Sequence, residues 1–173
     1  MKYLLCIAFL SAASLHAQVD FGQMSPNELA QYWLTNDCGV TDDGPAINQF
    51  LVAQVGAVEP LLIRAYQDGP GVDQIRQLEE QARMNFSVIQ KALESGNDFG
   101  LSKEDLELAR QQTVDEYVKA EREKFILGYR SQALLGLAAG GGEAGKKLLS
   151  EIASQEEQST LSRTARYGLE KME

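Results

Sequence analysis

The most constraining feature of this 173-residue chain is an apolar stripe of helical period in the segment 72–95. Its apolar side chains recur every three or four residues, at Ile75, Leu78, Ala82, Phe86, Ile89 and Leu93. This spacing places them on one face of an α-helix. Runs of alternating β-branched residues between turn pairs, which would indicate strands, are nearly absent. We therefore expect an all-α fold.

Capping and turn residues divide the rest of the chain into further helices. The sequence Ser25-Pro26-Asn27-Glu28 is a capping box with proline in the first helical position, and it predicts a helix that ends near Thr35. Gly56 is expected to separate the next two helices. The remaining helices are expected at 45–54, 57–67, 72–95, from 103 onward, at 143–154 and at about 159–172.

The helical pattern that follows the capping residue Ser102 continues to the glycines at 140–142. A single helix of ~38 residues is too long for a compact domain. We therefore expect a break or bend near Gly128.

Residues 1–17 have the three-part pattern of a cleavable secretory signal peptide. Lys2 precedes an apolar run, 3–10, and a stretch of small residues, 11–17. The run is much shorter than the ~20 apolar residues needed to span a bilayer, so it does not predict an anchor. Cleavage is expected after Ala17, with Ala13 as the alternative. The sequence thus predicts a secreted or periplasmic domain, 18–173, that is not stably inserted in a membrane.

Cleavage changes the chemistry that the chain retains. His16 and Cys6 leave with the signal peptide, so the mature chain has no histidine and one cysteine, Cys38. A Ser-His or Cys-His nucleophilic pair and zinc sites rich in His or Cys are therefore not expected. Cys38 is either a small buried hydrophobe or a bridge between chains.

The acidic residues are unevenly distributed. The formal net charge is −9, and the segment 18–63 contains no Lys or Arg. Such a chain is a poor ligand for nucleic acids, because neutralising phosphates requires clustered cations. The acidic segment is either a solvated face with helix caps or a docking surface for a basic partner or a cation. Its carboxylates are Asp20, Glu28, Asp37, Asp42, Asp43 and Glu59.

Six residues of this segment are candidate partner-binding residues. Four are carboxylates: Asp37, Asp42, Asp43 and Glu59. The other two are the neighbouring aromatic residues Tyr32 and Trp33. Exposed aromatic side chains often anchor protein interfaces. For Trp33 core packing is the default interpretation, and an exposed anchor is the alternative.

Parts of the chain resemble HEAT-type helical repeats. Ala133 and Gly136 recur about 32 residues later as Ala165 and Gly168. Small residues at these positions let paired helices approach closely. The segment 57–68, with its early proline, resembles the first helix of such a repeat. The resemblance implies stacked helical hairpins and protein binding, and it carries no catalytic residue. The helices at 72–95 and 102–127 are longer than such repeats use, so an irregular helical bundle is the alternative.

Two motifs with chemical meaning are incomplete. The segment 140–147 matches G-x-x-x-x-G-K of a phosphate loop, but Lys147 stands where a Ser or Thr would hold Mg²⁺. A helix is expected before it in place of a strand, so the motif indicates a helix end followed by a helix start. Asp37, Asp42 and Asp43 do not have the spacing of a calcium loop. We expect no catalytic residue, metal or cofactor.

These patterns predict an exported, non-catalytic protein-binding module, such as an adaptor in a cell-envelope complex, with another, basic protein as its partner. One alternative is a periplasmic inhibitor or immunity protein against a toxin or hydrolase. Another is a carboxylate-dependent hydrolase. An inhibitor should expose an acidic or aromatic patch, whereas a hydrolase should have a deep pocket with at least two convergent carboxylates.

Overall fold

The computed structural model describes residues 20–36, 44–155 and 159–172. Within these ranges every regular element is a helix, so the fold is all-α, as the sequence predicts. A short 3-10 helix, η1 (Phe21–Gln23), precedes eight α-helices in the described residues: α1 (Pro26–Thr35), α2 (Gly44–Ala53), α3 (Val55–Asp68), α4 (Val72–Glu94), α5 (Lys103–Gln111), α6 (Val114–Gly140), α7 (Glu143–Ala153) and α8 (Thr160–Met172).

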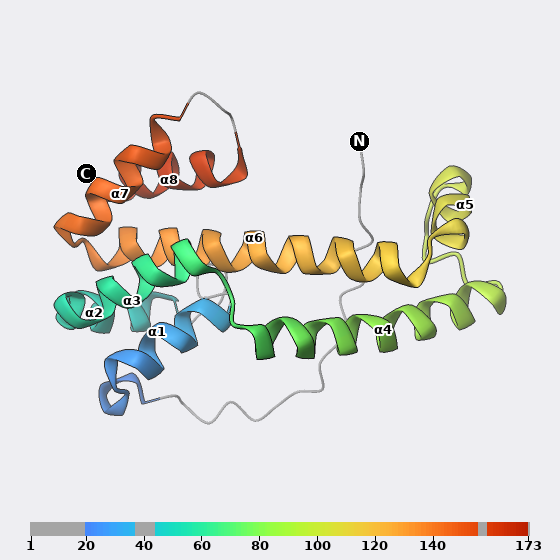
Figure 1. The fold of residues 1–173 in the computed structure, drawn as a ribbon, viewed down its shortest axis with the longest axis horizontal. Helices are drawn as coiled ribbons and strands as arrows, with labels where there is room; N and C mark the ends of the chain where they lie inside the picture. The colour runs from blue at the N-terminus through green and yellow to red at the C-terminus, as the bar shows by residue number, and fades with distance from the viewer. Residues whose placement is uncertain (1–19, 37–43, 156–158, 173) are drawn as a thin grey trace.

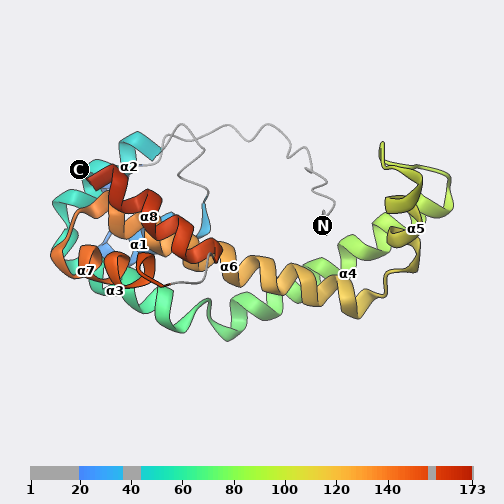
Figure 2. The same ribbon diagram turned by 90° about the horizontal axis from the view of Figure 1, so that it is seen from above.

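The described helices form a head and an arm (Figure 1). The arm, residues 72–127, consists of α4, α5 and the first half of α6. The other described residues form the head. Both views show α4 and the first half of α6 running side by side away from the head, with α5 at the far end (Figure 2). The two long helices are antiparallel, and only α6 belongs to both parts.

The core of the head surrounds the second half of α6. From Ala133 to Ala139 this part of α6 contains only apolar residues and Gly136, a pattern typical of a central buried helix. Ala133, Leu134 and Leu137 are almost completely buried. The residues that surround them come from every other helix of the head and include Leu29, Trp33, Leu51, Leu62, Leu149 and Ala165.

Small residues let the helices of the head approach closely, as the sequence predicts. A Cβ atom on Gly136 would lie 2.6 Å from Trp33 Nε1 and 2.9 Å from Leu62 Cδ1. A Cβ atom on Gly168 would lie 3.1 Å from Ala138 Cβ. Real Cβ atoms are essentially never found as close as the first two distances. Glycine is therefore required at 136, where α1 and α3 meet α6.

The arm has a thinner core than the head. On α4 only Ala82 and Leu93 of the apolar stripe are buried, because a two-helix arm covers each helix from one side. The half-buried Phe86 ring packs against Tyr117 of α6, with the ring centroids 5.5 Å apart. Pairs of charged side chains also join the two helices, Arg83 with Asp115 at 3.2 Å and Arg122 with Glu79 at 3.4 Å.

Two predicted helix boundaries are wrong. The long pattern after Ser102 breaks at Gln112–Thr113, and α6 continues through Gly128. Thr113 and Glu116 form a capping box that starts α6. A glycine inside a helix costs ~1 kcal/mol relative to alanine, which its neighbours can offset without ending the helix.

The second wrong boundary lies between α2 and α3. The break is at Gln54 and not at Gly56. The two helices meet at an angle of 104°.

Among the described residues no single helix is long and apolar enough to cross a membrane. The helices α2 and α3 meet the criteria of length and apolar composition only when they are taken together as this bent pair.

Candidate functional site

Three of the six candidate partner-binding residues belong to the described part of the chain. Tyr32, Trp33 and Glu59 are described, whereas Asp37, Asp42 and Asp43 lie outside the described residues, as does Cys38. The docking surface predicted from the three aspartates therefore stays a prediction.

Trp33 is a core residue and not an exposed anchor. Its side chain is only 3% exposed, and its indole Nε1 donates to the backbone oxygen of Gln132 at 2.8 Å. This hydrogen bond satisfies the polar atom of a buried tryptophan. Its neighbour Tyr32 is half-buried and packs edge-on against Phe21, with the ring centroids 5.3 Å apart. Both aromatic residues thus stabilise the contacts of α1 within the head.

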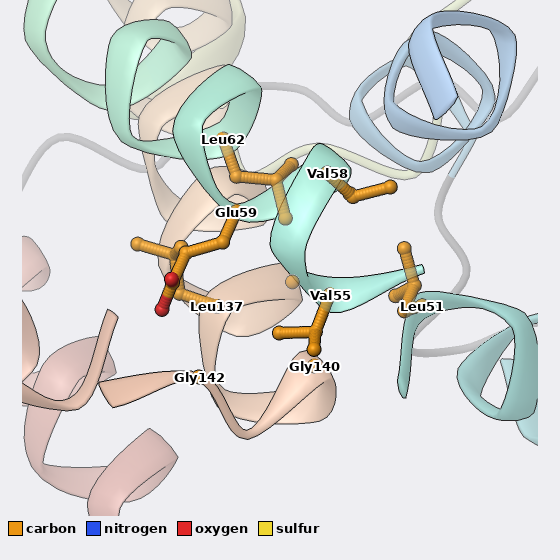
Figure 3. A pocket seen from close by; sticks show the side chains of 9 residues that line it. Leu51, Val55, Val58, Glu59, Leu62, Leu137, Gly140 and Gly142 are labelled. Carbon is orange, nitrogen blue, oxygen red and sulfur yellow. The ribbon is translucent and has the colours of Figure 1, made fainter. Parts of the chain in front are cut away.

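Glu59 makes an internal contact between two helices that are distant in the sequence. It projects from α3 (Figure 3). Its Oε1 accepts the backbone N–H of Gly145 at 2.6 Å. Gly145 is the third residue of α7, and Gly142, the residue before that helix, has no side chain to cap it. The Glu59 carboxylate therefore supplies both the missing cap and a negative charge at the positive end of the helix dipole.

The same contact explains the glycine-rich segment that resembles part of a phosphate loop. Gly141 ends α6 in the left-handed region with φ of 71°. A Cβ atom on Gly142 would collide with the Glu59 carboxylate. The glycines thus allow the chain to turn and let an anion approach the start of α7. That anion is the chain's own carboxylate.

A narrow crevice lies beside Glu59 (Figure 3). It lies between the helices α2 and α3 on one side and the end of α6 on the other, with Val55, Leu62 and Leu137 among its lining residues. Its volume of about 10 Å³ is close to the minimum for one water molecule. The crevice is therefore too small for a substrate.

A larger open groove lies where the arm joins the head. We call it the junction groove, and its volume is about 340 Å³. This volume is at the lower end of the range for ligand pockets, ~300–1,000 Å³. Three helices line it. The end of α1 contributes Leu34 and Thr35, with Asn36 directly after it, and α4 contributes Leu78. The residues from α6 are Glu121, Lys124, Phe125, Gly128, Tyr129 and Gln132.

Aromatic and apolar side chains dominate the junction groove. The rings of Phe125 and Tyr129 lie one helical turn apart, with their centroids 6.2 Å apart. Burial raises the pKa of Tyr129, and a hydrogen bond with Gln31 opposes this effect. Gly128 lies between the two rings in sequence, and a Cβ atom there would have no neighbour within 4 Å. The absence of a side chain at 128 leaves part of the groove open.

The groove and the crevice each contain a single carboxylate. In the groove this is Glu121, whose Oε1 lies 3.9 Å from Lys124 Nζ, and in the crevice it is Glu59. Neither offers the two convergent carboxylates that a glycosidase-type hydrolase needs. Among the described residues, no cluster of three or more His, Cys, Asp or Glu side chains is arranged to hold a metal ion.

The junction groove was not predicted from the sequence. Its sequence signal is the pair Phe125 and Tyr129, one turn apart, with Gly128 between them. That signal is weak without the fold, since Leu34 and Leu78 come from other helices.

The chain matches no protein-family model, no curated protein and no solved structure. The resemblance to HEAT-type repeats therefore has no match to support it beyond the all-helical packing of the described residues.

Proposed function

We propose that this chain is an exported, non-catalytic protein-binding module that acts as an adaptor. The observation that carries the proposal is the incompletely covered arm. Within the arm, α4 and the first half of α6 pack against each other, and large apolar side chains remain in contact with solvent. Exposed apolar side chains that lie together, as Met84 and Val88 do one turn apart on α4, often mark protein interaction sites.

The most exposed apolar side chains of the arm lie on α4 and α5. Met84 and Val88 are one turn apart on α4, and they are 57% and 56% exposed. Val72 at the start of α4 is 84% exposed, and Leu108 on α5 is 67% exposed. A partner that covered these side chains would gain roughly 25 cal/mol for each Å² of apolar surface removed from water.

The head supports the same proposal through its resemblance to HEAT-type repeats. In this interpretation the second half of α6, together with α7 and α8, corresponds to the repeat-like segments of the sequence. The recurring small residues Gly136 and Gly168 lie at close helix contacts. Such repeats form rigid scaffolds for protein binding.

An adaptor fits the described acidic residues better than an inhibitor does. Asp20, Glu28 and Glu59 each accept a backbone N–H at or near the start of a helix. These three carboxylates therefore act as helix caps. An inhibitor that used the acidic segment would depend on Asp37, Asp42 and Asp43.

The export part of the proposal has a direct test. The full chain is produced with a C-terminal tag, recovered from the medium or the periplasmic fraction, and sequenced from its N-terminus. We expect the mature chain to begin at Gln18. A chain that retained residues 1–17 and stayed with the cells would contradict export.

The binding part is tested by crosslinking the tagged chain in its producing cells and identifying the captured proteins by mass spectrometry. The double variant Met84→Ser/Val88→Ser should lose the crosslinked partner. Both side chains are more than half exposed, so the fold should be kept. Val52→Ser is the matched control, since Val52 is 54% exposed on α2 in the head. An unchanged partner in the double variant, or no partner for the unaltered chain, would contradict the proposal.

A further inference from the structure

We infer that two copies of this chain associate through the outer face of α4, with the two helices antiparallel. This dimer rests on the proposed protein-binding function of the arm and makes a second copy the partner of α4. The outer face is the side of α4 that points away from α6. Its residues are exposed and recur every three or four positions: Asp73, Gln77, Glu80, Met84, Val88 and Lys91.

The outer face lies opposite the apolar stripe of α4. Met84 is about 200° around the helix from the buried Ala82, and Lys91 is about 200° around it from the buried Leu93. Among the described residues α6 is the main neighbour of α4. The helix α5 lies on the α6 side of the far end of the arm (Figure 1). The described helices therefore leave the outer face exposed along α4.

Met84 and Val88 give the outer face an apolar centre. They lie one turn apart and are 57% and 56% exposed. Most oligomers of identical chains are symmetric dimers in which the same surface of both copies meets. With the two-fold axis at the level of position 86, Met84 of each copy faces Val88 of the other. The contact then removes the apolar side chains of both copies from water.

Glu80 and Lys91 flank this centre with opposite charges. Along the helix, Glu80 lies ~9 Å before position 86 and Lys91 lies ~7.5 Å after it. Two antiparallel copies therefore bring each Glu80 level with Lys91 of the other copy. Within one chain the two residues are three turns apart, and neither forms an ion pair among the described residues. The dimer thus supplies charged partners that the single chain lacks.

Arg76 and Glu94 form a second complementary set on one edge of the outer face. Both are exposed, and they share this edge because five full turns separate them. The two-fold axis brings each Arg76 to within ~3 Å, measured along the helix, of the level of Glu94 of the other copy. Arg76 also pairs with Asp73 of its own chain at 2.9 Å. Such an exposed pair contributes little and leaves the guanidinium able to contact a second carboxylate.

The charges select the antiparallel arrangement and a second copy as the partner. Parallel copies would place Glu80 beside Glu80 and Lys91 beside Lys91, which is unfavourable. The helix α4 contains four carboxylates and three cations, so it is nearly neutral in a chain of net charge −9. Local repulsion between two copies is therefore small at this helix.

Sedimentation equilibrium of the tagged chain, purified from its producing cells, tests the dimer. We expect a reversible monomer–dimer equilibrium with a Kd in the micromolar range, because a single pair of helices forms a small interface. Met84→Ser/Val88→Ser should raise the dimer Kd at least about tenfold, whereas Val52→Ser in the head should leave it unchanged. Circular dichroism checks that each variant stays helical.

Charge reversal tests the antiparallel pairing without changing the apolar centre. Glu80→Lys and Lys91→Glu should each raise the dimer Kd at least about tenfold, because each turns two attractive contacts into two repulsive ones. The double variant Glu80→Lys/Lys91→Glu restores opposite charges and should dimerise like the unaltered chain. An equimolar mixture of the two single variants should form a mixed dimer. Glu151→Lys on α7 is the control, since Glu151 is exposed in the head.

Three results would overturn the dimer. A chain that stays monomeric at about 100 μM has no stable contact between copies. A dimer that persists in Met84→Ser/Val88→Ser uses another surface. Opposite effects of Glu80→Lys and Lys91→Glu, with no recovery in the double variant, would reflect net charge alone, because the first makes the chain less acidic and the second more acidic.

The dimer and the adaptor function fail separately. If the chain is monomeric and a different protein is crosslinked in a way that depends on Met84 and Val88, the adaptor function stands and the dimer fails. If the chain dimerises as described and crosslinking captures no other protein, the dimer stands and the adaptor function fails.

Discussion

At the scale of single residues, the Glu59 carboxylate links α3 to the start of α7. Its Oε1 accepts the backbone N–H of Gly145 at 2.6 Å, at a helix start with no other side-chain cap. We expect Glu59→Ala to lower the free energy of unfolding by about 1–2 kcal/mol, because the cap and its charge are both lost. Glu59→Gln keeps an acceptor and should cost less. Urea denaturation measures both, with Glu151→Gln on α7 as the exposed control.

A double-mutant cycle shows whether Gly142 is needed because of Glu59. A Cβ atom at 142 would meet the Glu59 carboxylate, so Gly142→Ala should be destabilising in the unaltered chain. In the Glu59→Ala background the collision is gone, and the same substitution should cost clearly less. Equal costs in the two backgrounds would show that Gly142 is required for a different reason.

The capping box of α1 makes part of the stability depend on pH. Hydrogen bonds from the Ser25 hydroxyl and backbone N–H lower the pKa of Glu28 below its ordinary value of 4.5. Such a carboxyl contributes stability that is fully present above the unfolded pKa and is lost as the pH falls through the lower folded pKa. We expect the urea midpoint of the unaltered chain to fall more steeply below pH 4.5 than that of Glu28→Gln. Parallel curves for the two chains would contradict this role of Glu28.

At the scale of a single helix, two glycines of α6 have opposite requirements. A Cβ atom on Gly128 meets nothing within 4 Å, whereas on Gly136 it would lie 2.6 Å from Trp33 Nε1. Gly128→Ala should therefore stabilise the chain by about 0.5–1 kcal/mol through helix propensity. Gly136→Ala should destabilise it by about 1–3 kcal/mol, because the core has to shift to accept a methyl group.

Thermal and urea unfolding of the two variants measure this contrast. Both substitutions are the same chemical change in the same helix, so each is the control for the other. Destabilisation by Gly128→Ala would mean that the arm needs flexibility or close packing at 128. A neutral Gly136→Ala would mean that Trp33 can move at little cost.

The helices themselves were largely predictable because their signals are local. The Ser25 and Glu28 capping box starts α1, and the apolar stripe of α4 follows from the spacing of its residues. The break before α6 was misplaced, although Thr113 and Glu116 form an equally local capping box. The break was expected near Gly128 instead, but α6 continues through this residue, because a helix tolerates a single glycine.

The candidate site was less predictable because it depends on tertiary contacts. Glu59 is one carboxylate of an acidic segment in the sequence, and only the fold brings it to Gly145. Core packing was the default interpretation of Trp33, but the sequence alone could not remove it from the candidate anchors, because its contact with Gly136 comes from another helix. The junction groove needs side chains from three helices, so no single segment indicates it.

At the scale of the whole molecule, stability is unevenly distributed between head and arm. The second half of α6 contributes several almost completely buried residues to the head core, whereas α5 contains no buried residue. Segments with few buried apolar contacts open at a lower free energy than the global unfolding. The arm should therefore open locally while the head remains folded.

Hydrogen exchange measured along residues 18–173 tests this division. We expect the fastest helical exchange in α5, intermediate protection in α4 and the first half of α6, and the highest protection in the second half of α6. The gradient within α6 is the decisive part, because one continuous helix passes from a thin core to a thick one. Uniform protection along α6 would mean that the arm and the head unfold together. Added partner should slow exchange in the arm more than in the head, since the apolar side chains it would cover lie there.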